Sequence, residues 1–420
     1  MDPAPASTPR APVEGRPGGA AARDSKGGAP LAIRNARILP SPDAPAIEPG
    51  TILIRGGRIV AMGPEVTIPP EVPVIPGEGR VVTAGFWNAH VHFTEPKWRS
   101  PLRKRSTLLE AQFHDMFSSR GFTTVVDTGS DPRVTLPLRQ RVVSEGLLGP
   151  TIYTAGPSVF PPHGIPYYLR DTLPFWLRPF VPQPSGPAAA ARAARRNFAQ
   201  GADLLKLFTG SYVARGKVTT MPESIARAAV EVAHAHGRLV FSHPSNLEGT
   251  RIAIRSGVDV LAHPPDTTEG VDDSVLQQMV ERKMAMIPTL KMFADTASSR
   301  REYLLPIYEV VRRFRARGGQ LLFGTDVGYM TDYSTEDEFR ALERSGVEGR
   351  EILRMLTTAP AHWFGAGAET GSIAVGHRAD LTILDADPMG DVLAFARVSG
   401  TVRAGRVLHL RSGPSNSIGR

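Results

Sequence analysis

The chain of 420 residues contains no cysteine, and this absence excludes several kinds of chemistry at once. Disulfide bonds, cysteine-ligated zinc or iron–sulfur sites and thiol nucleophiles are all impossible. A metal ion would have to be held by histidine, carboxylate or lysine-derived ligands. Long apolar runs are absent too, since none reaches the roughly 18 residues that a membrane span needs. We therefore expect no membrane-spanning segment.

Acidic residues are fewer than basic ones, with 41 Asp and Glu against 49 Lys and Arg, so the formal net charge is +8. A basic surplus can indicate nucleic-acid binding, but no RNP, zinc-finger or basic-leucine-zipper pattern accompanies it. We therefore expect no nucleic-acid partner. The basic run Lys97–Arg105 either attracts an anionic substrate or forms a solvated face.

Both ends of the chain look different from its middle. Residues 1–30 are rich in Pro, Ala, Gly and Ser, which predicts a disordered tail, and residues 412–420 form a second tail. The first tail contains no apolar core of a signal peptide. We therefore expect a cytoplasmic protein, with export after removal of a signal peptide as the alternative.

Strand patterns occupy residues 31–82 and return in residues 366–411, and Gly56-Gly57 has the pattern of a hairpin turn. Two such clusters at opposite ends predict one small β-sandwich domain built from both termini. The middle, residues 83–365, alternates short apolar runs with helical patterns, which fits an α/β fold with a closed (β/α)8 barrel. An open doubly wound sheet is the rival, but no G-x-G-x-x-G turn follows a strand. The eight runs lie at 81–93, 123–129, 151–156, 203–208, 238–243, 258–263, 285–290 and 321–326.

Polar side chains that carry chemistry follow several of these runs, at the end of a barrel where catalytic groups gather. They are His90, His92, Lys206, His243, His263 and Asp326. In a strand, residues i and i+2 face the same side, so His90 and His92 can reach one metal ion. His234 and His236 have the same spacing in a helical pattern, where they diverge by about 200° and cannot share an ion.

Lys206 lies between two leucines of an apolar strand, where an unpaired charge is costly. It either forms a buried ion pair or has a lowered pKa and reacts with CO2 to form a carbamate that two metal ions share. His243 and His263 at successive strand ends favour ligands over structural histidines. Asp326 either caps the following turn or serves as metal ligand and general base.

Two further residues are candidates for substrate binding and catalysis. His163 lies in a PPHG loop, and Tyr212 follows the Lys206 strand. Each is expected either to stabilise a substrate carbonyl or carboxylate or to be an ordinary loop residue. The surrounding segment 161–187 is dense in proline and aromatic residues, which predicts a structured loop or lid over the barrel.

Taken together, these motifs resemble the amidohydrolase superfamily of metal-dependent hydrolases, over roughly residues 31–410. The resemblance rests on TAGFWNAHVHF, LLKLF, VFSHP, VLAHPP, FGTDVG, LTTAPAHWFG and GSIAVGHRADLTILDADP. It implies a distorted TIM barrel with a terminal β-sandwich, a homo-oligomer, and a centre of two divalent ions, with zinc the expected metal. By this resemblance His90, His92 and Asp326 bind the first ion and His243 and His263 the second, with N6-carboxylated Lys206 bridging them.

Within the superfamily the chain is most similar to the imidazolonepropionase-related, prolidase-like branch. Lys206 argues against the mononuclear imidazolonepropionases and deaminases. The branch implies hydrolysis of an amide or peptide bond in a small carboxylate-bearing substrate, such as an Xaa-Pro dipeptide or an N-acyl amino acid, including ochratoxin-like amides. The alternatives are a cyclic-amide hydrolase, an esterase or lactonase on the same centre, or a non-catalytic barrel scaffold.

Overall fold

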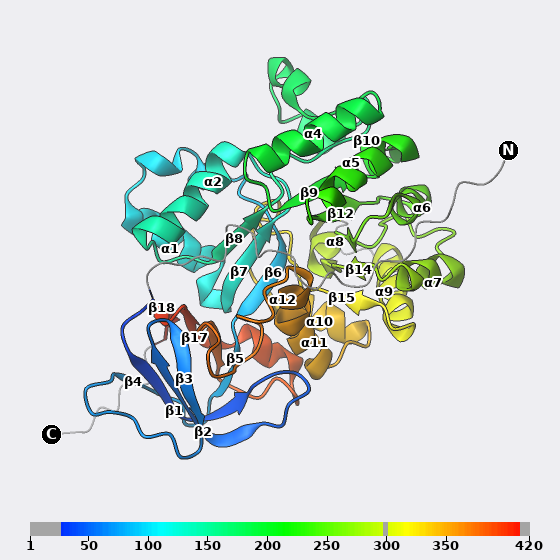
Figure 1. Cartoon of the computed structure of the whole chain (residues 1–420). Coiled ribbons are helices and arrows are strands. Elements are labelled where there is room, and N and C mark those ends of the chain that lie inside the picture. The colour runs from blue at the N-terminus through cyan, green and yellow to red at the C-terminus, as the bar shows by residue number, and fades with distance from the viewer. Residues whose placement is uncertain (1–26, 297–300, 412–420) are drawn as a thin grey trace.

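A computed structural model describes residues 27–296 and 301–411 (Figure 1). Most of the predicted tail at residues 1–30 and all of the tail at 412–420 lie outside the described residues. None of the helices in the described ranges combines the length and apolar character needed to cross a membrane.

Strands from the two ends of the chain form one sheet, in the order β18-β17-β16-β5-β1-β2-β3, with β4 paired to β1. The link between the ends is the antiparallel pair β5–β16, in which Val82 faces Ile383. The Gly56-Gly57 turn has positive φ at both positions, as a tight hairpin between β2 and β3 requires. The sheet is continuous, and the sandwich form of this domain stays a prediction. The strands are β1 Leu31–Leu39, β2 Ile47–Arg55, β3 Arg58–Gly63, β4 Val74–Pro76, β5 Val81–Ala84, β16 Leu381–Leu384, β17 Val398–Arg403 and β18 Arg406–Leu410.

The eight apolar runs of the middle each contain or adjoin a strand, and every pairing among these eight strands is parallel. They form two sheets, β6-β7-β8 and β15-β14-β13-β12-β9, rather than one closed ladder. Single bridges lie at both gaps, between Val159 and Leu207 and between Val91 and Val327. The strands are β6 Phe86–Val91, β7 Phe122–Asp127, β8 Thr151–Thr154, β9 Leu204–Phe208, β12 Leu239–His243, β13 Val260–Leu261, β14 Ala285–Met286 and β15 Gln320–Leu321.

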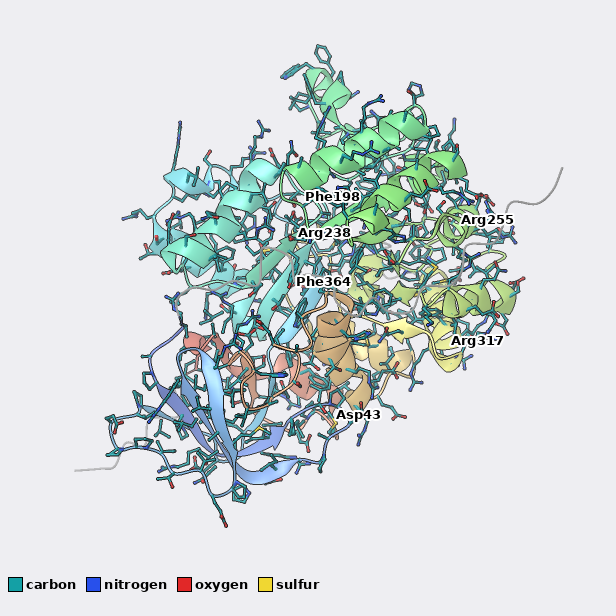
Figure 2. All side chains as sticks on the ribbon, viewed as in Figure 1. Asp43, Phe198, Arg238, Arg255, Arg317 and Phe364 are labelled. Carbon is teal, nitrogen blue, oxygen red and sulfur yellow. The ribbon has the colours of Figure 1, made fainter. Side chains whose placement is uncertain are left out.

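Helices surround these two sheets on the outside (Figure 1). The strands between them are buried on both faces, which explains their nearly continuous apolar sequences. Phe364 lies near the centre of the view in Figure 2 and packs on Trp87 and Tyr153, with ring centroids 5.6 and 4.8 Å away. The main helices are α1 Ser106–Met116, α2 Pro132–Gln140, α4 Pro187–Ala199, α5 Glu223–Ala235, α6 Leu247–Ser256, α7 Asp273–Glu281, α8 Leu290–Thr296, α9 Arg301–Ala316, α10 Glu336–Arg344, α11 Gly349–Leu356 and α12 Thr358–Trp363.

The predicted loop at residues 161–187 follows β8 and contains only two short helical pieces, α3 Tyr167–Arg170 and the 3-10 helix Phe175–Phe180. Its root is tied to the body, because the Ser211 hydroxyl donates to the Gly164 carbonyl at 2.6 Å. The 3-10 piece is open to solvent, since Phe175, Trp176 and Phe180 are 74, 61 and 81% exposed. The root and the tip of this loop therefore have very different environments.

One buried carboxyl makes stability depend on pH. Glu338 on α10 is 1% exposed and accepts a hydrogen bond from the Lys291 backbone nitrogen at 2.7 Å. Burial raises its pKa to about 7. The folded protein then holds this proton more tightly than the unfolded chain, so stability falls as pH rises from about 4.5 to 7.

We therefore expect Glu338→Gln to raise the melting temperature at pH 8, relative to the unmodified protein, by a few degrees. At pH 5 the two proteins should melt much closer together, as measured by calorimetry. Glu336→Gln, an exposed position on the same helix, is the matched control. An equal shift at both pH values would contradict the argument.

Candidate metal centre

The six predicted ligands come together at one end of the barrel strands. His90 and His92 stand at the end of β6, Lys206 on β9, and His243 at the end of β12. His263 follows β13 by two residues, and Asp326 follows β15 by five. Because the strands are parallel, their carboxyl ends meet on the same side of the fold.

The Asp326 carboxylate is the centre of this arrangement. Its Oδ1 lies 3.4 Å from His90 Nε2 and 3.0 Å from His92 Nε2. Its Oδ2 lies 3.8 Å from His263 Nε2. The His263 ring in turn packs against His90 and His243, at centroid distances of 4.6 and 4.8 Å.

Hydrogen bonds on the far side of the rings fix which nitrogen faces Asp326. His90 Nδ1 donates to the Ala262 carbonyl at 3.0 Å, and His92 Nδ1 donates to the Gly129 carbonyl at 3.2 Å. A carbonyl can only accept, so Nδ1 carries the proton and the Nε2 lone pair of each ring points at the carboxylate.

Thr289 holds the third ring in the same way. Its hydroxyl donates to the Pro288 carbonyl at 2.9 Å, so it accepts from His263 Nδ1 at 2.7 Å. Burial lowers the pKa of His90 and of His263 well below the usual value, which keeps both rings neutral. Three Nε2 lone pairs therefore face one carboxylate.

This arrangement of lone pairs fits a cation. His90 Nε2 and Asp326 Oδ1 are buried and have no aligned hydrogen-bond partner in the described part of the chain. The donor atoms of His90, His263 and Asp326 all lie within 4.8 Å of one another. Neutral imidazole and carboxylate are typical ligands of Zn²⁺, and a divalent ion among them would remove the repulsion between the lone pairs.

Lys206 and His243 also belong to this cluster, since His243 packs on His263 and Asp326 acts electrostatically on both groups. Lys206 is 2% exposed, and desolvation lowers its pKa to about 7, against a smaller opposite effect of Asp326. Among the described residues no carboxylate lies within ion-pair distance of its amine, so the buried ion pair considered from sequence is not seen. His243 stacks on Phe208 at 4.8 Å, and burial lowers its pKa to about 3.

The backbone around Asp326 is unusual. Asp326 has a φ of 59°, in the left-handed region that costs energy for a residue with a side chain. A Cβ at the nearby Gly328 would lie 1.9 Å from the His92 carbonyl oxygen, so only glycine fits there. Burial by itself raises the Asp326 pKa, but His90, His92 and Lys206 outweigh it and keep the carboxyl ionised.

The two predicted substrate-binding residues have different environments. His163 is exposed, with a φ of 55°, and makes no hydrogen bond or ring contact with the cluster among the described residues. Tyr212 on β10 (Gly210–Ala214) is half-buried, and its hydroxyl lies 2.8 Å from Thr267 Oγ1. Thr267 belongs to the loop after His263, so Tyr212 reaches the cluster side of the barrel.

The side chains of the helical pair His234 and His236 contact different partners, in line with the divergence that helical spacing predicts. His234 Nε2 lies 3.1 Å from Asp259 Oδ2, whereas His236 Nδ1 donates to the Val232 carbonyl at 2.8 Å.

One lysine of the basic run Lys97–Arg105 interacts with neighbouring side chains. Lys97 lies 3.6 Å from Glu95 and 4.1 Å above the Tyr333 ring.

Sequence reasoning passed over several residues near the cluster. Thr289 orients His263, Asp266 is a half-buried carboxyl three residues after His263, and the Tyr168 ring lies tilted against Tyr329, with centroids 5.6 Å apart. Asp266 has a visible sequence signal, since it follows a strand end in VLAHPPD. The contact of Thr289 with His263 has none.

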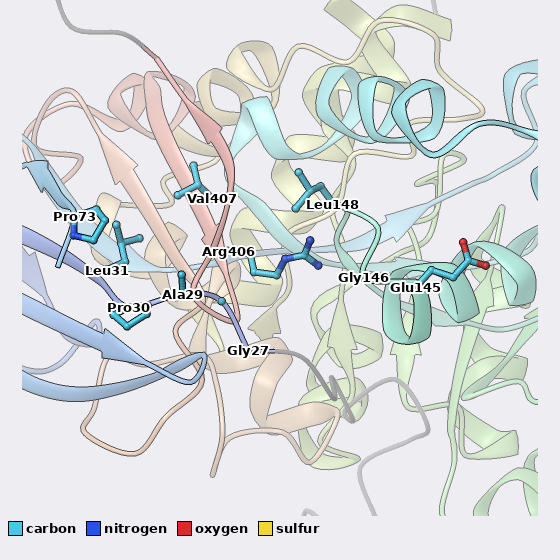
Figure 3. A pocket seen from close by; sticks show the side chains of 12 residues that line it. Gly27, Ala29, Pro30, Leu31, Pro73, Glu145, Gly146, Leu148, Arg406 and Val407 are labelled. Carbon is cyan, nitrogen blue, oxygen red and sulfur yellow. The ribbon is translucent and has the colours of Figure 1, made fainter. Parts of the chain in front are cut away.

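A separate pocket lies away from these residues (Figure 3). Its walls are the start of β1, the segment Glu145–Leu148 and the strand β18, with the Arg406 side chain between them. It includes none of the predicted site residues, so we assign it no part in the chemistry.

The similarity to known proteins extends over most of the chain. The sequence profile of the amidohydrolase family matches residues 81–408. An uncharacterized protein of Mycobacterium tuberculosis is 28% identical over 196 residues, covering 43% of this chain and 50% of that protein. The chain thus spans about half the length of the first curated relatives that it matches. Ochratoxinase of Aspergillus niger is 22% identical over 380 residues, covering 80% of this chain and 76% of the enzyme.

Among solved structures, a Xaa-Pro dipeptidase with methionine bound in its active site has a TM-score of 0.77. It is 22% identical, and the match covers 90% of this chain and 99% of that one. At this identity the likeness shows a shared α/β fold of the TIM-barrel type.

Proposed function

The chain belongs to the amidohydrolase family, and from this premise we propose that it is a metal-dependent hydrolase that cleaves a carbon–nitrogen bond. The observation that carries the proposal is the convergence of three oriented imidazoles on Asp326, with the buried amine of Lys206 beside them. We propose His90, His92 and Asp326 as ligands of one divalent ion, and His243 and His263 as ligands of a second. Lys206, carboxylated on its amine, would bridge the two.

Divalent ions bound at this centre supply Lewis acidity, which polarises a carbonyl and makes water more acidic. Asp326 Oδ1 faces His90 and His92, whereas Oδ2 faces His263, 3.8 Å from its Nε2. We propose that Oδ2 takes the proton of the attacking water and passes it to the departing amine. The loop at 161–187 excludes water while Tyr212 and His163 orient the substrate.

The proposed substrates are Xaa-Pro dipeptides or N-acyl amino acids, including ochratoxin-like amides. The similarity to a Xaa-Pro dipeptidase and to ochratoxinase supports this choice. A cyclic-amide hydrolase or a lactonase would use the same residues, and a non-catalytic scaffold has no need of the oriented imidazoles. The homo-oligomer, the zinc content and the cytoplasmic location expected from sequence stay predictions.

A substrate panel tests the proposal. The chelator-treated protein and the protein reloaded with Zn²⁺ are assayed with Xaa-Pro dipeptides, N-acyl amino acids, hydantoins and lactones. We expect hydrolysis of one of the first two classes, lost on chelation and restored by metal. Hydrolysis confined to hydantoins or lactones would favour the alternatives, and unchanged activity after complete metal removal would contradict the proposed mechanism.

A further inference from the structure

Asp127, the last residue of β7, is a fully buried carboxyl that the proposed mechanism does not use. Its Oδ1 accepts from the Gly129 backbone nitrogen at 3.2 Å and from the Ser130 hydroxyl at 2.6 Å. Its Oδ2 accepts from the hydroxyls of Thr135 and Thr154, at 3.1 and 2.7 Å. Because each of these groups donates, the surroundings suit the ionised form of the carboxyl.

The partners of this carboxylate are neutral. Among the described residues no lysine or arginine side chain lies within ion-pair distance of it, and the histidine that acts on it electrostatically is His92. Burial raises the Asp127 pKa, whereas His92 and the hydrogen bonds act in the opposite direction. A buried charge without a counter-charge costs stability, which makes Asp127 a candidate for a role in the function of the protein.

The residues that bond Asp127 also hold His92. Gly129, whose nitrogen donates to Asp127, accepts the Nδ1 proton of His92 on its carbonyl at 3.2 Å. Ser130, whose hydroxyl donates to Asp127, accepts on that hydroxyl from the Phe93 backbone nitrogen at 2.8 Å. Two short chains of hydrogen bonds therefore connect Asp127 with His92, one through the ring and one through the backbone that follows it.

The backbone before His92 is fixed by the same segment. The Thr128 nitrogen donates to the Val91 carbonyl at 3.0 Å, and Val91 is paired with Asp127 between β6 and β7. A ring whose Nδ1–H is held by a fixed carbonyl keeps its Nε2 lone pair directed at one point. A shift of the segment after Asp127 would therefore move His92 Nε2, which lies 3.0 Å from Asp326 Oδ1.

The charge of Asp127 acts in the same direction as its hydrogen bonds. The proposed ligands of two divalent ions carry only the negative charges of Asp326 and of carboxylated Lys206. A further buried carboxylate behind His92 attracts cations to the centre, and water screens such a buried charge only weakly.

We propose that Asp127 is a positioning residue of the metal centre, which fixes the His92 imidazole through Gly129 and Ser130 and strengthens metal binding with its charge. This inference rests on the proposed function, because it takes His92 as a metal ligand. Residues that orient a ligating histidine from behind typically change metal affinity or activity by about 10- to 100-fold when they are replaced.

The test measures the affinity of the metal-free protein for Zn²⁺ by competition with a chromophoric chelator. Asp127→Asn keeps the shape of the side chain but loses the charge, and its amide nitrogen leaves one pair of donors without an acceptor. We expect it to bind Zn²⁺ about 10-fold or more weakly than the unmodified protein. Ser130→Ala, which removes the link to Phe93, should weaken binding by about 5-fold, the factor for one hydrogen bond.

Thr135→Val is the matched control, because it removes a hydroxyl that bonds Asp127 but, among the described residues, none of residues 91–93. Its Zn²⁺ affinity should be that of the unmodified protein. Equal losses in Ser130→Ala and Thr135→Val would mean that Asp127 only supports the fold, and would overturn the inference. If Asp127→Asn does not fold, as judged by its melting curve, this comparison alone decides.

A second measurement depends on neither metal nor activity. In metal-free protein labelled with ¹⁵N-histidine, the side-chain NMR signal of His92, assigned by its loss in His92→Gln, should show the Nδ1–H tautomer alone. Asp127→Asn should produce a mixture of tautomers, whereas Thr135→Val should not. If the unmodified protein binds no metal, the proposed function fails, and this signal still tests the positioning role. A His92 signal that is the same in the unmodified protein and in Asp127→Asn would overturn that role.

Discussion

Replacing Asp326 by asparagine is expected to lower kcat by about 10²- to 10⁴-fold, the range typical of a lost general base. Asparagine keeps an oxygen near His90 and His92, so much of the metal should stay bound. It has no carboxylate that can take a proton from water, so the chemical step fails. The measurement is kcat on the best substrate of the panel, together with metal content by mass spectrometry.

The control for this variant is Asp387→Asn, the same chemical change on a partly exposed carboxyl paired with Arg37 outside the barrel. It should retain both activity and metal. Undiminished hydrolysis by the Asp326 variant with its metal still bound would show that the base has been assigned to the wrong residue. A loss of activity that follows only the loss of metal would make Asp326 a ligand alone.

The positions of the strands could be predicted because apolar runs between polar segments are a local property of the chain. The clustering of the candidate histidines could be predicted for a related reason, since each interrupts or ends such a run. The distinction between His90-Val91-His92 and His234-Ala235-His236 needed only the period of a strand and of a helix. The structure gives the members of the second pair different hydrogen-bond partners.

Other features could not be predicted because they depend on contacts between distant segments. Thr289 is 26 residues from His263, and nothing local marks its hydroxyl as the group that sets the ring tautomer. The close approach of Gly328, two residues after the left-handed Asp326, to the His92 carbonyl also joins segments far apart in the sequence. The lengths of the strands could not be predicted from the apolar runs either, because the run at 258–263 contains only the two-residue strand Val260–Leu261.

Lys206 is expected to be as important as Asp326, for a different reason. Its amine is buried without an ion-pair partner in the described chain and has a pKa lowered to about 7, so a large fraction is neutral at physiological pH. A neutral amine attacks CO2, forms a nitrogen–carbon bond and releases a proton, giving a carbamate that carries a negative charge. Lys206→Met fills similar space but cannot form this group. We expect it to lose at least one metal equivalent and about 10³-fold or more of the activity, equivalent to several kcal/mol.

Two further variants separate the carbamate from a role for the positive charge. Lys206→Arg keeps the charge but forms no carbamate under these conditions, so it should be as inactive as Lys206→Met. Lys206→Ala leaves a space in which acetate or propionate can provide a carboxylate, so these acids should restore part of its metal content and activity. Incorporation of ¹³C-bicarbonate into the unmodified protein, seen as one carbamate signal by NMR, would establish the group directly. An active arginine variant would show instead that the centre needs a cation at this position, and the bridging role of Lys206 would be wrong.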